Sequence, residues 1–260
     1  MTTFKESVLI LLFEFLGTLL LTALICATVA DVTGLICGFF ILLIFSARIS
    51  GSHFNPAITL AFMFRRDTGR FSRLLGILYI AAQYGGALLG SLLTYNLFEA
   101  AISDKVGVKV MSIRKDDDHN YIFQGMIVEL LGTMILTFLY LTQTEEKTKM
   151  SGDPAITTLI IAATYTAICV NSLSPAVPIT YSPFNPAAAL GITFSMIFKS
   201  QLDDTNNTWV FLIFGYIGSL LAVLLFEFVY KKAMTVVEDA NDDDDEEQQE
   251  HDALITPSSR

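Results

Sequence analysis

Apolar residues along the chain gather in long runs that polar stretches separate, and this pattern predicts membrane-spanning helices. A helix needs about 20 apolar residues to cross a hydrocarbon core of ~30 Å. The first run, at 8–29, holds a single charged residue in 22 positions. Six segments have this character, and we expect spans at about 6–29, 32–51, 73–98, 121–142, 155–174 and 209–231.

Two shorter apolar segments begin at a repeated tetrapeptide, Phe-Asn-Pro-Ala, and extend to about residues 64 and 198. Asn is a favoured N-cap, and Pro is favoured at the first position of a helix. A helix should therefore begin at each copy, which contains Asn55, Pro56 and Ala57 or Asn185, Pro186 and Ala187. About ten helical residues cover ~15 Å, half of the hydrocarbon core, so we expect two half-helices.

Other matches divide the chain into two similar halves. FEFLGTLLLT at 13–22 shares six of ten residues with VELLGTMILT at 128–137, and the matches that follow come in the same order. Because each half has three spans, an odd number, the second half enters the bilayer from the opposite side. The sequence thus predicts an all-α membrane protein with an inverted internal repeat: first repeat 1–98, extracellular connecting loop 99–120, second repeat 121–232 and an acidic, disordered cytoplasmic tail 233–260.

Composition and charge agree with a membrane protein and narrow its possible functions. The chain is 53% hydrophobic, and its mean hydropathy is +0.55. With both termini inside, the loops and span ends on the inner side hold nine Lys and Arg residues, and those on the outer side hold five. Because positive residues favour the cytoplasmic side, we expect both termini in the cytoplasm. Ten of the 26 acidic residues lie at 238–252, in a tail that is either only solvated or a docking element for a partner.

The residue pattern does not favour an enzyme, a metal site, a cofactor or a nucleic-acid surface. It contains no nucleophile–base pair, metal-ligand spacing or phosphate-binding loop, and the three cysteines all lie in apolar stretches. One Asn-Pro alone is ordinary turn chemistry. Two copies at matched positions of an inverted repeat bring two positive helix N-termini together near the midplane, with asparagine NH₂ donors beside backbone acceptors. That combination suits a small neutral molecule such as water.

The sequence resembles the aquaporins, which belong to the major intrinsic protein family. The resemblance covers nearly the whole membrane body and rests on EFLGT (14–18), ISGSHFNPAITLA (49–61), AAQYGGALLG (81–90), ELLGT (129–133), VPIT (177–180), FNPA (184–187) and WVFLIFGYIGSLLA (209–222). It implies six tilted helices and two half-helices around one pore per subunit, in a homotetramer embedded in lipid. It also implies that Glu14 and Glu129 brace the half-helix loops, with proton relay as the alternative, and we expect His53 to brace its loop as well.

The chain departs from the family at the outer filter. Carried over by position, the filter residues are Leu35, Leu173, Ser182 and Ala188, and Ala188 stands where most relatives have arginine. Losing a fixed positive charge and its donors removes a barrier to cations. The expected function is a passive channel for water, with small neutral solutes such as glycerol, urea, ammonia or peroxide as further candidates. The alternatives are a structural or adhesive tetramer with a poorly conducting pore and, ranked lower, an ion-conducting relative.

Overall fold

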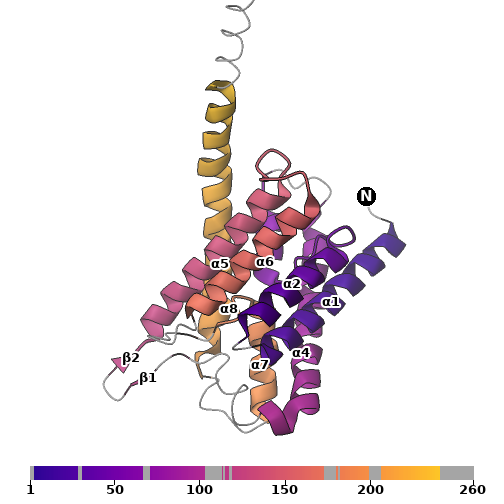
Figure 1. Ribbon diagram of the computed structural model, residues 1–260, viewed down its shortest axis with the longest axis vertical. Helices are drawn as coiled ribbons and strands as arrows, with labels where there is room; N and C mark the ends of the chain where they lie inside the picture. The colour runs from indigo at the N-terminus through magenta and orange to yellow at the C-terminus, as the bar shows by residue number, and fades with distance from the viewer. Residues whose placement is uncertain are drawn as a thin grey trace, which may run out of the picture.

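The computed structural model describes residues 3–28, 31–66, 71–102, 113, 115–116, 119–172, 180, 182–198 and 206–240. Within them the two halves of the chain carry helices in the same order: a long helix, a shorter one, a half-helix and another long one (Figure 1). The first half contains α1 (Phe4–Ala27), α2 (Val32–Ser46), α3 (Pro56–Phe64) and α4 (Arg73–Ile102). The second contains α5 (Ile122–Thr144), α6 (Pro154–Ser172), α7 (Pro186–Phe198) and α8 (Thr208–Leu225).

Both half-helices begin where the sequence predicted, at the proline after each asparagine. Of the helices in the described ranges, α1, α4, α5 and α8 are by themselves long and apolar enough to cross a membrane. The second expected span is shorter than predicted, because α2 ends at Ser46 and residues 47–50 form a turn. Its 15 residues cover about 22 Å. The apolar run continues past the helix because its last residues belong to the loop that leads to α3.

Close backbone crossings hold the long helices of each half together. Helix α1 packs along α4, and α5 packs along α8. A side chain at Gly86 would place its Cβ 2.2 Å from the carbonyl oxygen of Phe15, and one at Gly218 would place it 2.3 Å from that of Leu130. These glycines occupy matched positions of the repeat. The same close approach therefore occurs twice, once in each half.

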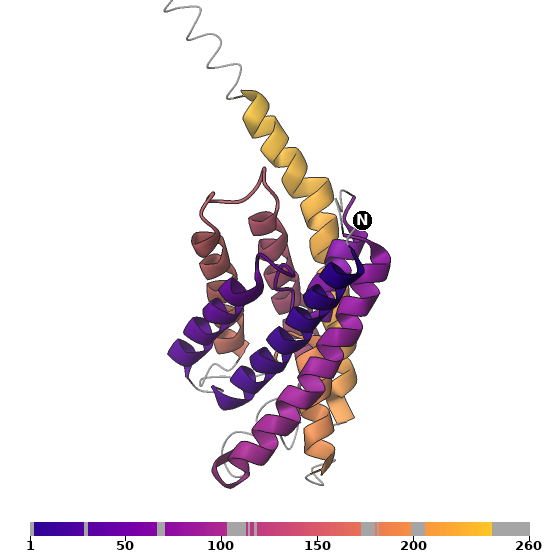
Figure 2. The same ribbon diagram turned by 90° about the vertical axis from the view of Figure 1, so that its right-hand side faces the viewer.

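The chain ends of the described structure lie at one end of the bundle. Figures 1 and 2 both show the N-terminus on the side where the C-terminal helix extends beyond the other helices. That helix continues from α8 through a π-helical segment, η2 (Phe226–Tyr230), to Ala240. The expected disordered tail at 233–260 is therefore wrong for residues 233–240, which are helical, while 241–260 lie outside the described residues.

The connecting loop is also shorter than expected, because α4 continues to Ile102 instead of ending near residue 98. Two short strands, β1 (Lys115–Asp116) and β2 (His119–Asn120), pair in antiparallel fashion within this connection. Ile113 forms an isolated bridge with Thr180, which precedes the second half-helix. The connection between the halves therefore contacts the loop that leads to α7.

Candidate functional site

The first turns of α3 and α7 have the asparagine caps that the sequence predicted. The Oδ1 atom of Asn55 accepts a hydrogen bond from the backbone N–H of Ala57 at 2.9 Å. In the second half, Asn185 Oδ1 accepts one from the backbone N–H of Ala187 at 3.0 Å. Each asparagine thus satisfies a helix N–H that would otherwise lack an acceptor.

The two asparagines also join the halves of the molecule to each other. Asn55 Nδ2 donates to the carbonyl oxygen of Phe184 at 2.9 Å, and Asn185 Nδ2 donates to that of Phe54 at 2.8 Å. These reciprocal bonds connect residues about 130 positions apart and place the two half-helix N-termini side by side. They correct one expectation: each NH₂ group commits one of its two N–H bonds to the opposite loop, so one remains where two were expected.

Phe54 and Phe184, the residues before the two caps, have an uncommon backbone conformation and fully buried rings. Their φ angles are +48° and +46°, in the left-handed region that bulky residues seldom adopt. Each ring lies over a glycine of the preceding long helix. A Cβ at Gly17 would lie 1.9 Å from a ring carbon of Phe54, and one at Gly132 would lie 2.3 Å from a ring carbon of Phe184. The glycine in each EFLGT-type motif thus makes room for the phenylalanine of the repeated tetrapeptide.

Glu14 braces the loop before α3 by direct contact with its backbone. Its Oε1 accepts from the N–H of His53 at 3.0 Å, and its Oε2 accepts from the N–H of Phe54 at 2.9 Å. The Ser50 hydroxyl and the Gln83 amide also donate to this carboxyl group, at 2.6 and 2.8 Å. Glu14 is fully buried, and these four donors account for a polar group at that depth.

Glu129 contacts the second loop differently. The Ser182 hydroxyl donates to Glu129 Oε2, and Ser182 Oγ in turn accepts from the backbone N–H of Phe184 at 2.9 Å. Thr133 makes a longer contact with Glu129 Oε1 at 3.4 Å. Among the described residues, the carboxyl group therefore reaches the loop backbone through Ser182. The hydroxyl of Ser182, which we expected in the filter, takes part in bracing.

His53 lies in an aromatic enclosure beside the first loop. Its ring is 4.4 Å from that of Phe62 and 5.3 Å from that of Tyr79, measured between centroids. Its Nδ1 is 3.2 Å from Thr59 Oγ1, a hydroxyl that also accepts from Gln83 Nε2 at 2.8 Å. The histidine side chain is buried and held from several sides by these contacts.

The structure describes three of the four expected filter residues. Leu35 lies in the first turn of α2 and Ala188 in the first turn of α7, and both belong to one continuous buried cluster. Ser182 is buried beside Glu129. Leu173 lies outside the described residues.

The sequence analysis missed two tyrosines that contact the first loop. The Tyr79 hydroxyl donates to the carbonyl oxygen of Ser50 at 2.8 Å. The Tyr140 hydroxyl donates to the carbonyl oxygens of Gly51 and Ser52, the second at 2.9 Å. Both tyrosines lie in apolar spans, where they look like ordinary core residues. A hydroxyl on a buried side chain, which must find a partner, was the only available signal.

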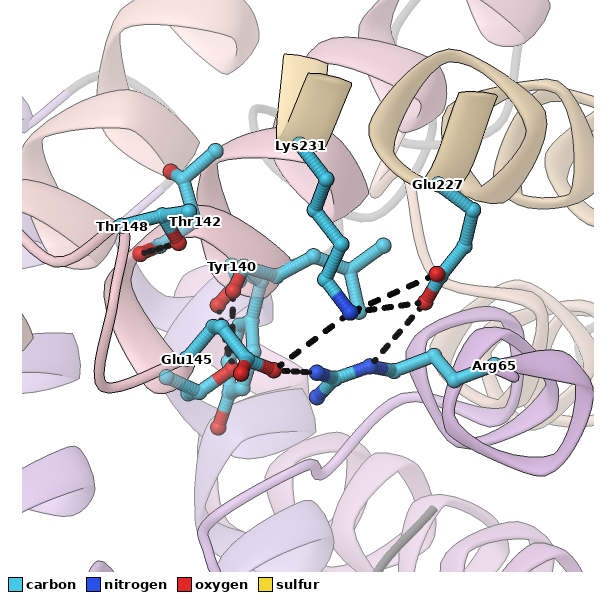
Figure 3. A network of polar contacts seen from close by, with 9 residues as sticks. Arg65, Tyr140, Thr142, Glu145, Thr148, Glu227 and Lys231 are labelled. Atoms are coloured by element: carbon cyan, nitrogen blue, oxygen red, sulfur yellow. Dashed lines mark hydrogen bonds and ion pairs between the residues drawn. The ribbon is translucent and has the colours of Figure 1, made fainter. Parts of the chain in front are cut away.

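A network of ion pairs ties the far end of α3 to two other helices (Figure 3). Arg65, the C-cap of α3, pairs with Glu145 at the end of α5 and lies 3.8 Å from Glu227 in η2. Lys231 lies 3.3 Å from Glu227 and 3.9 Å from Glu145. The sequence analysis did not predict this network. Because its residues are far apart in the sequence, no local pattern reveals the network.

This arrangement defines a class of protein: an all-helical membrane protein in which two half-helices meet through paired Asn-Pro-Ala motifs. The sequence model of the major intrinsic protein family matches residues 32–226, and the chain belongs to that family. This confirms the predicted family and fold and identifies an integral membrane protein. The members of the family are channels, in agreement with the expectation that the chain is not an enzyme.

Individual relatives agree with the family match. Aquaporin PIP2-4 of Oryza sativa subsp. japonica is 27% identical over 192 residues, which cover 74% of this chain and 63% of that protein. Aquaporin-4 of Bos taurus is 29% identical over 184 residues, which cover 70% of this chain and 50% of that protein. The chain thus spans less than two thirds of the length of these relatives.

A solved structure shows the same fold. The aquaglyceroporin from Plasmodium falciparum matches 88% of this chain and 99% of its own chain, with a TM-score of 0.69 and 24% sequence identity. The eight helices and their order therefore correspond to a known architecture.

Proposed function

We propose that this protein is a passive transmembrane channel for water, with a path that passes Asn55 and Asn185. The observation that carries the proposal is the pair of reciprocal hydrogen bonds between these asparagines and the opposite loops. Each half-helix N-terminus carries about half a positive charge, and two of them at one point disfavour a cation. Within the described residues, the second N–H of each amide has no protein acceptor. A small neutral molecule with lone pairs fits these donors.

We extend the proposal to small neutral solutes such as glycerol, urea, ammonia and peroxide. The support is the filter position Ala188, where a methyl group replaces the arginine usual among relatives. A methyl group supplies neither the volume nor the charge of a guanidinium group, so the expected filter is wider. Leu35 and Leu173 would give this filter an apolar wall, and the backbone of Ser182 would complete it. The aquaglyceroporin from Plasmodium falciparum, which has the same fold, is consistent with this range of solutes.

We also propose a homotetramer in lipid with both termini in the cytoplasm. The outward faces of the long helices carry large apolar side chains, among them Leu12, Ile77, Ile135 and Ile213. Such faces suit lipid tails or neighbouring subunits. The N-terminus and the C-terminal helix lie at the same end of the bundle (Figure 1), which supports placing both termini on one side of the membrane. The lysine and arginine counts favour the cytoplasmic side.

Stopped-flow light scattering from proteoliposomes tests the channel. Vesicles with the protein should shrink faster than protein-free vesicles under an osmotic step, and glycerol or urea should then enter them faster. Planar bilayers should show no cation current. Rates equal to those of lipid alone would refute the channel, and flux-free particles that stack in ordered layers would instead support the adhesive alternative.

A matched pair of variants tests the role of Asn55. Asn55→Asp keeps an oxygen that caps α3 but removes the NH₂ donors, so water permeability should fall well below the wild-type value. Asn96→Asp makes the same change at an exposed site in α4, where the amide donates to the carbonyl of Leu92 at 2.8 Å. This control should conduct like the wild type. Equal permeability of the two variants would mean that Asn55 does not line the path.

A further inference from the structure

The hydroxyl of Tyr140 occupies backbone acceptors that precede the first half-helix. Its single O–H lies within hydrogen-bond distance of the carbonyl oxygens of two successive residues, Gly51 and Ser52, the second at 2.9 Å, and is shared between them. Non-helical backbone at membrane depth must be satisfied by protein or by water in a conduit. Two of the carbonyls that could accept hydrogen bonds from passing water are therefore already bonded to a side chain.

The contact lies at the boundary between exposed and buried parts of the loop. Gly51 is exposed, whereas every residue from Ser52 to Asn55 is buried. Backbone dihedrals at this point are also unusual, with φ of +85° at Gly51 and +55° at Ser52. A non-glycine residue held in the left-handed region indicates a conformation that its surroundings impose. The Tyr140 hydroxyl bridges the two sides of this boundary.

The tyrosine ring is held in place by its neighbours. It is 2% exposed, and it meets the rings of Phe62 and His53 edge to face, with centroids 5.9 and 6.0 Å apart. Tyr140 also lies little more than one turn before Glu145, which Arg65 pairs with at the end of α5 (Figure 3). The ion-pair network thus fixes the helix end from which the ring projects.

The inverted repeat shows that this contact belongs to one half only. The offset that relates Glu14 to Glu129 relates Ile25 to Tyr140. Ile25 is buried like Tyr140, at 8% exposure, but its side chain has no hydrogen-bond donor. The two halves therefore differ at this helix position: the loop before α3 receives a hydroxyl from it, whereas the carbonyl of Pro183, before α7, receives the hydroxyl of Tyr165 from α6 at 2.9 Å.

We propose that Tyr140 limits water passage by occupying the Gly51 and Ser52 carbonyls at the mouth of the path, on the end that carries both termini. The inference rests on the proposed function and adds a rate-determining residue to it. Water must compete with the tyrosine hydroxyl for these acceptors before it reaches the asparagines. The highest energy barrier to water then lies near the first loop and not at the altered filter beside Ala188.

Three single variants test this inference by stopped-flow water permeability per reconstituted molecule. Tyr140→Phe removes the hydroxyl and keeps the ring, and Tyr140→Ile copies the residue of the matched position. Tyr84→Phe is the control, because its hydroxyl bonds Tyr216 at 2.9 Å between α4 and α8 and is not bonded to the loop. Tyr140→Phe should raise permeability roughly two- to tenfold, the factor that one net hydrogen bond corresponds to. Tyr140→Ile should raise it further, and Tyr84→Phe should match the wild type.

The outcomes separate this inference from the channel itself. If the wild type conducts and Tyr140→Phe conducts equally or less, the role of Tyr140 is refuted while the channel stands. If the wild type conducts and Tyr140→Phe conducts faster, both proposals are supported. Wild-type flux at the level of protein-free lipid refutes the channel, and the role of Tyr140 with it. Because Tyr140→Phe preserves the shape of the core, the test holds even where Tyr140→Ile does not fold.

Discussion

Replacing Glu14 by glutamine should destabilise the protein more than the same change at Glu129. Glu14 accepts two backbone N–H bonds, from His53 and Phe54, together with one bond each from Ser50 and Gln83. In the variant, one oxygen becomes an NH₂ group that cannot accept. A buried donor left without an acceptor costs about 1–3 kcal/mol.

The structure indicates how much of this loss can be recovered. The Gln83 Oε1 atom is buried and has no hydrogen-bond partner among the described residues, so a flipped Gln83 can accept from the new amide at position 14. The backbone N–H of Phe54 has no such option, because the backbone cannot turn. We therefore expect Glu14→Gln to cost about 1–3 kcal/mol, the value for one orphaned donor.

Glu129 provides the matched comparison. Its contacts in the described structure are with the hydroxyls of Ser182 and Thr133, and a hydroxyl can rotate to donate elsewhere or to accept. Glu129→Gln should therefore cost less than Glu14→Gln. The assay is the thermal aggregation midpoint of each purified variant in one mild detergent, with hydrogen exchange of the loop at 50–55 as a local measure. An equal or larger loss in Glu129→Gln would refute this account of the bracing.

Two further substitutions test packing and charge. Gly132→Ala should lower the thermal midpoint, because its Cβ would lie 2.3 Å from a ring carbon of the buried Phe184 and overpacking costs about 1–3 kcal/mol. Gly152→Ala is the control, because in the described structure its Cβ would have no atom within 4 Å apart from its chain neighbours. Equal midpoints would contradict the prediction. Arg65→Met should lower the thermal midpoint, because Glu145 and Glu227 would then share Lys231 as the cation beside them in this network. The cost should be less than the ~3–5 kcal/mol of a buried pair that loses its only partner. Adding Glu145→Gln should recover part of the loss, and an unchanged single variant would show that the network does not stabilise the fold.

Much of the architecture was predictable because it follows from local chemistry. The starts of α3 and α7 follow from the Asn-Pro pair, since one residue caps and the next fits only the first turn. The spans follow from the length of apolar runs. The end of α2 at Ser46 was not predictable from hydropathy, because the turn and loop that follow it, 47–54, are themselves partly apolar and buried.

The repeat marked two pairs of residues at the site, whereas His53 and the filter positions were predicted from their place in the sequence. The matched pairs Asn55 and Asn185, and Glu14 and Glu129, were found because each residue occurs at the same place in both halves. Tyr140 was missed because its counterpart is Ile25, so the repeat gives no signal there. Features that differ between the halves depend on tertiary contacts, which a single sequence does not show.

The reciprocal asparagine bonds make the two loops depend on each other. Asn55 can reach the carbonyl of Phe184 only if Phe184 keeps its left-handed backbone, and that conformation is held by a ring seated on Gly132. By symmetry, Asn185 depends on Phe54 and on the glycine at position 17. A disturbance that begins at either glycine should therefore displace the amide donor of the opposite half. The symmetry of the fold thus fixes the asparagines, whereas the contact of Tyr140 with the first loop, which the repeat does not duplicate, is where we propose that water passage is limited.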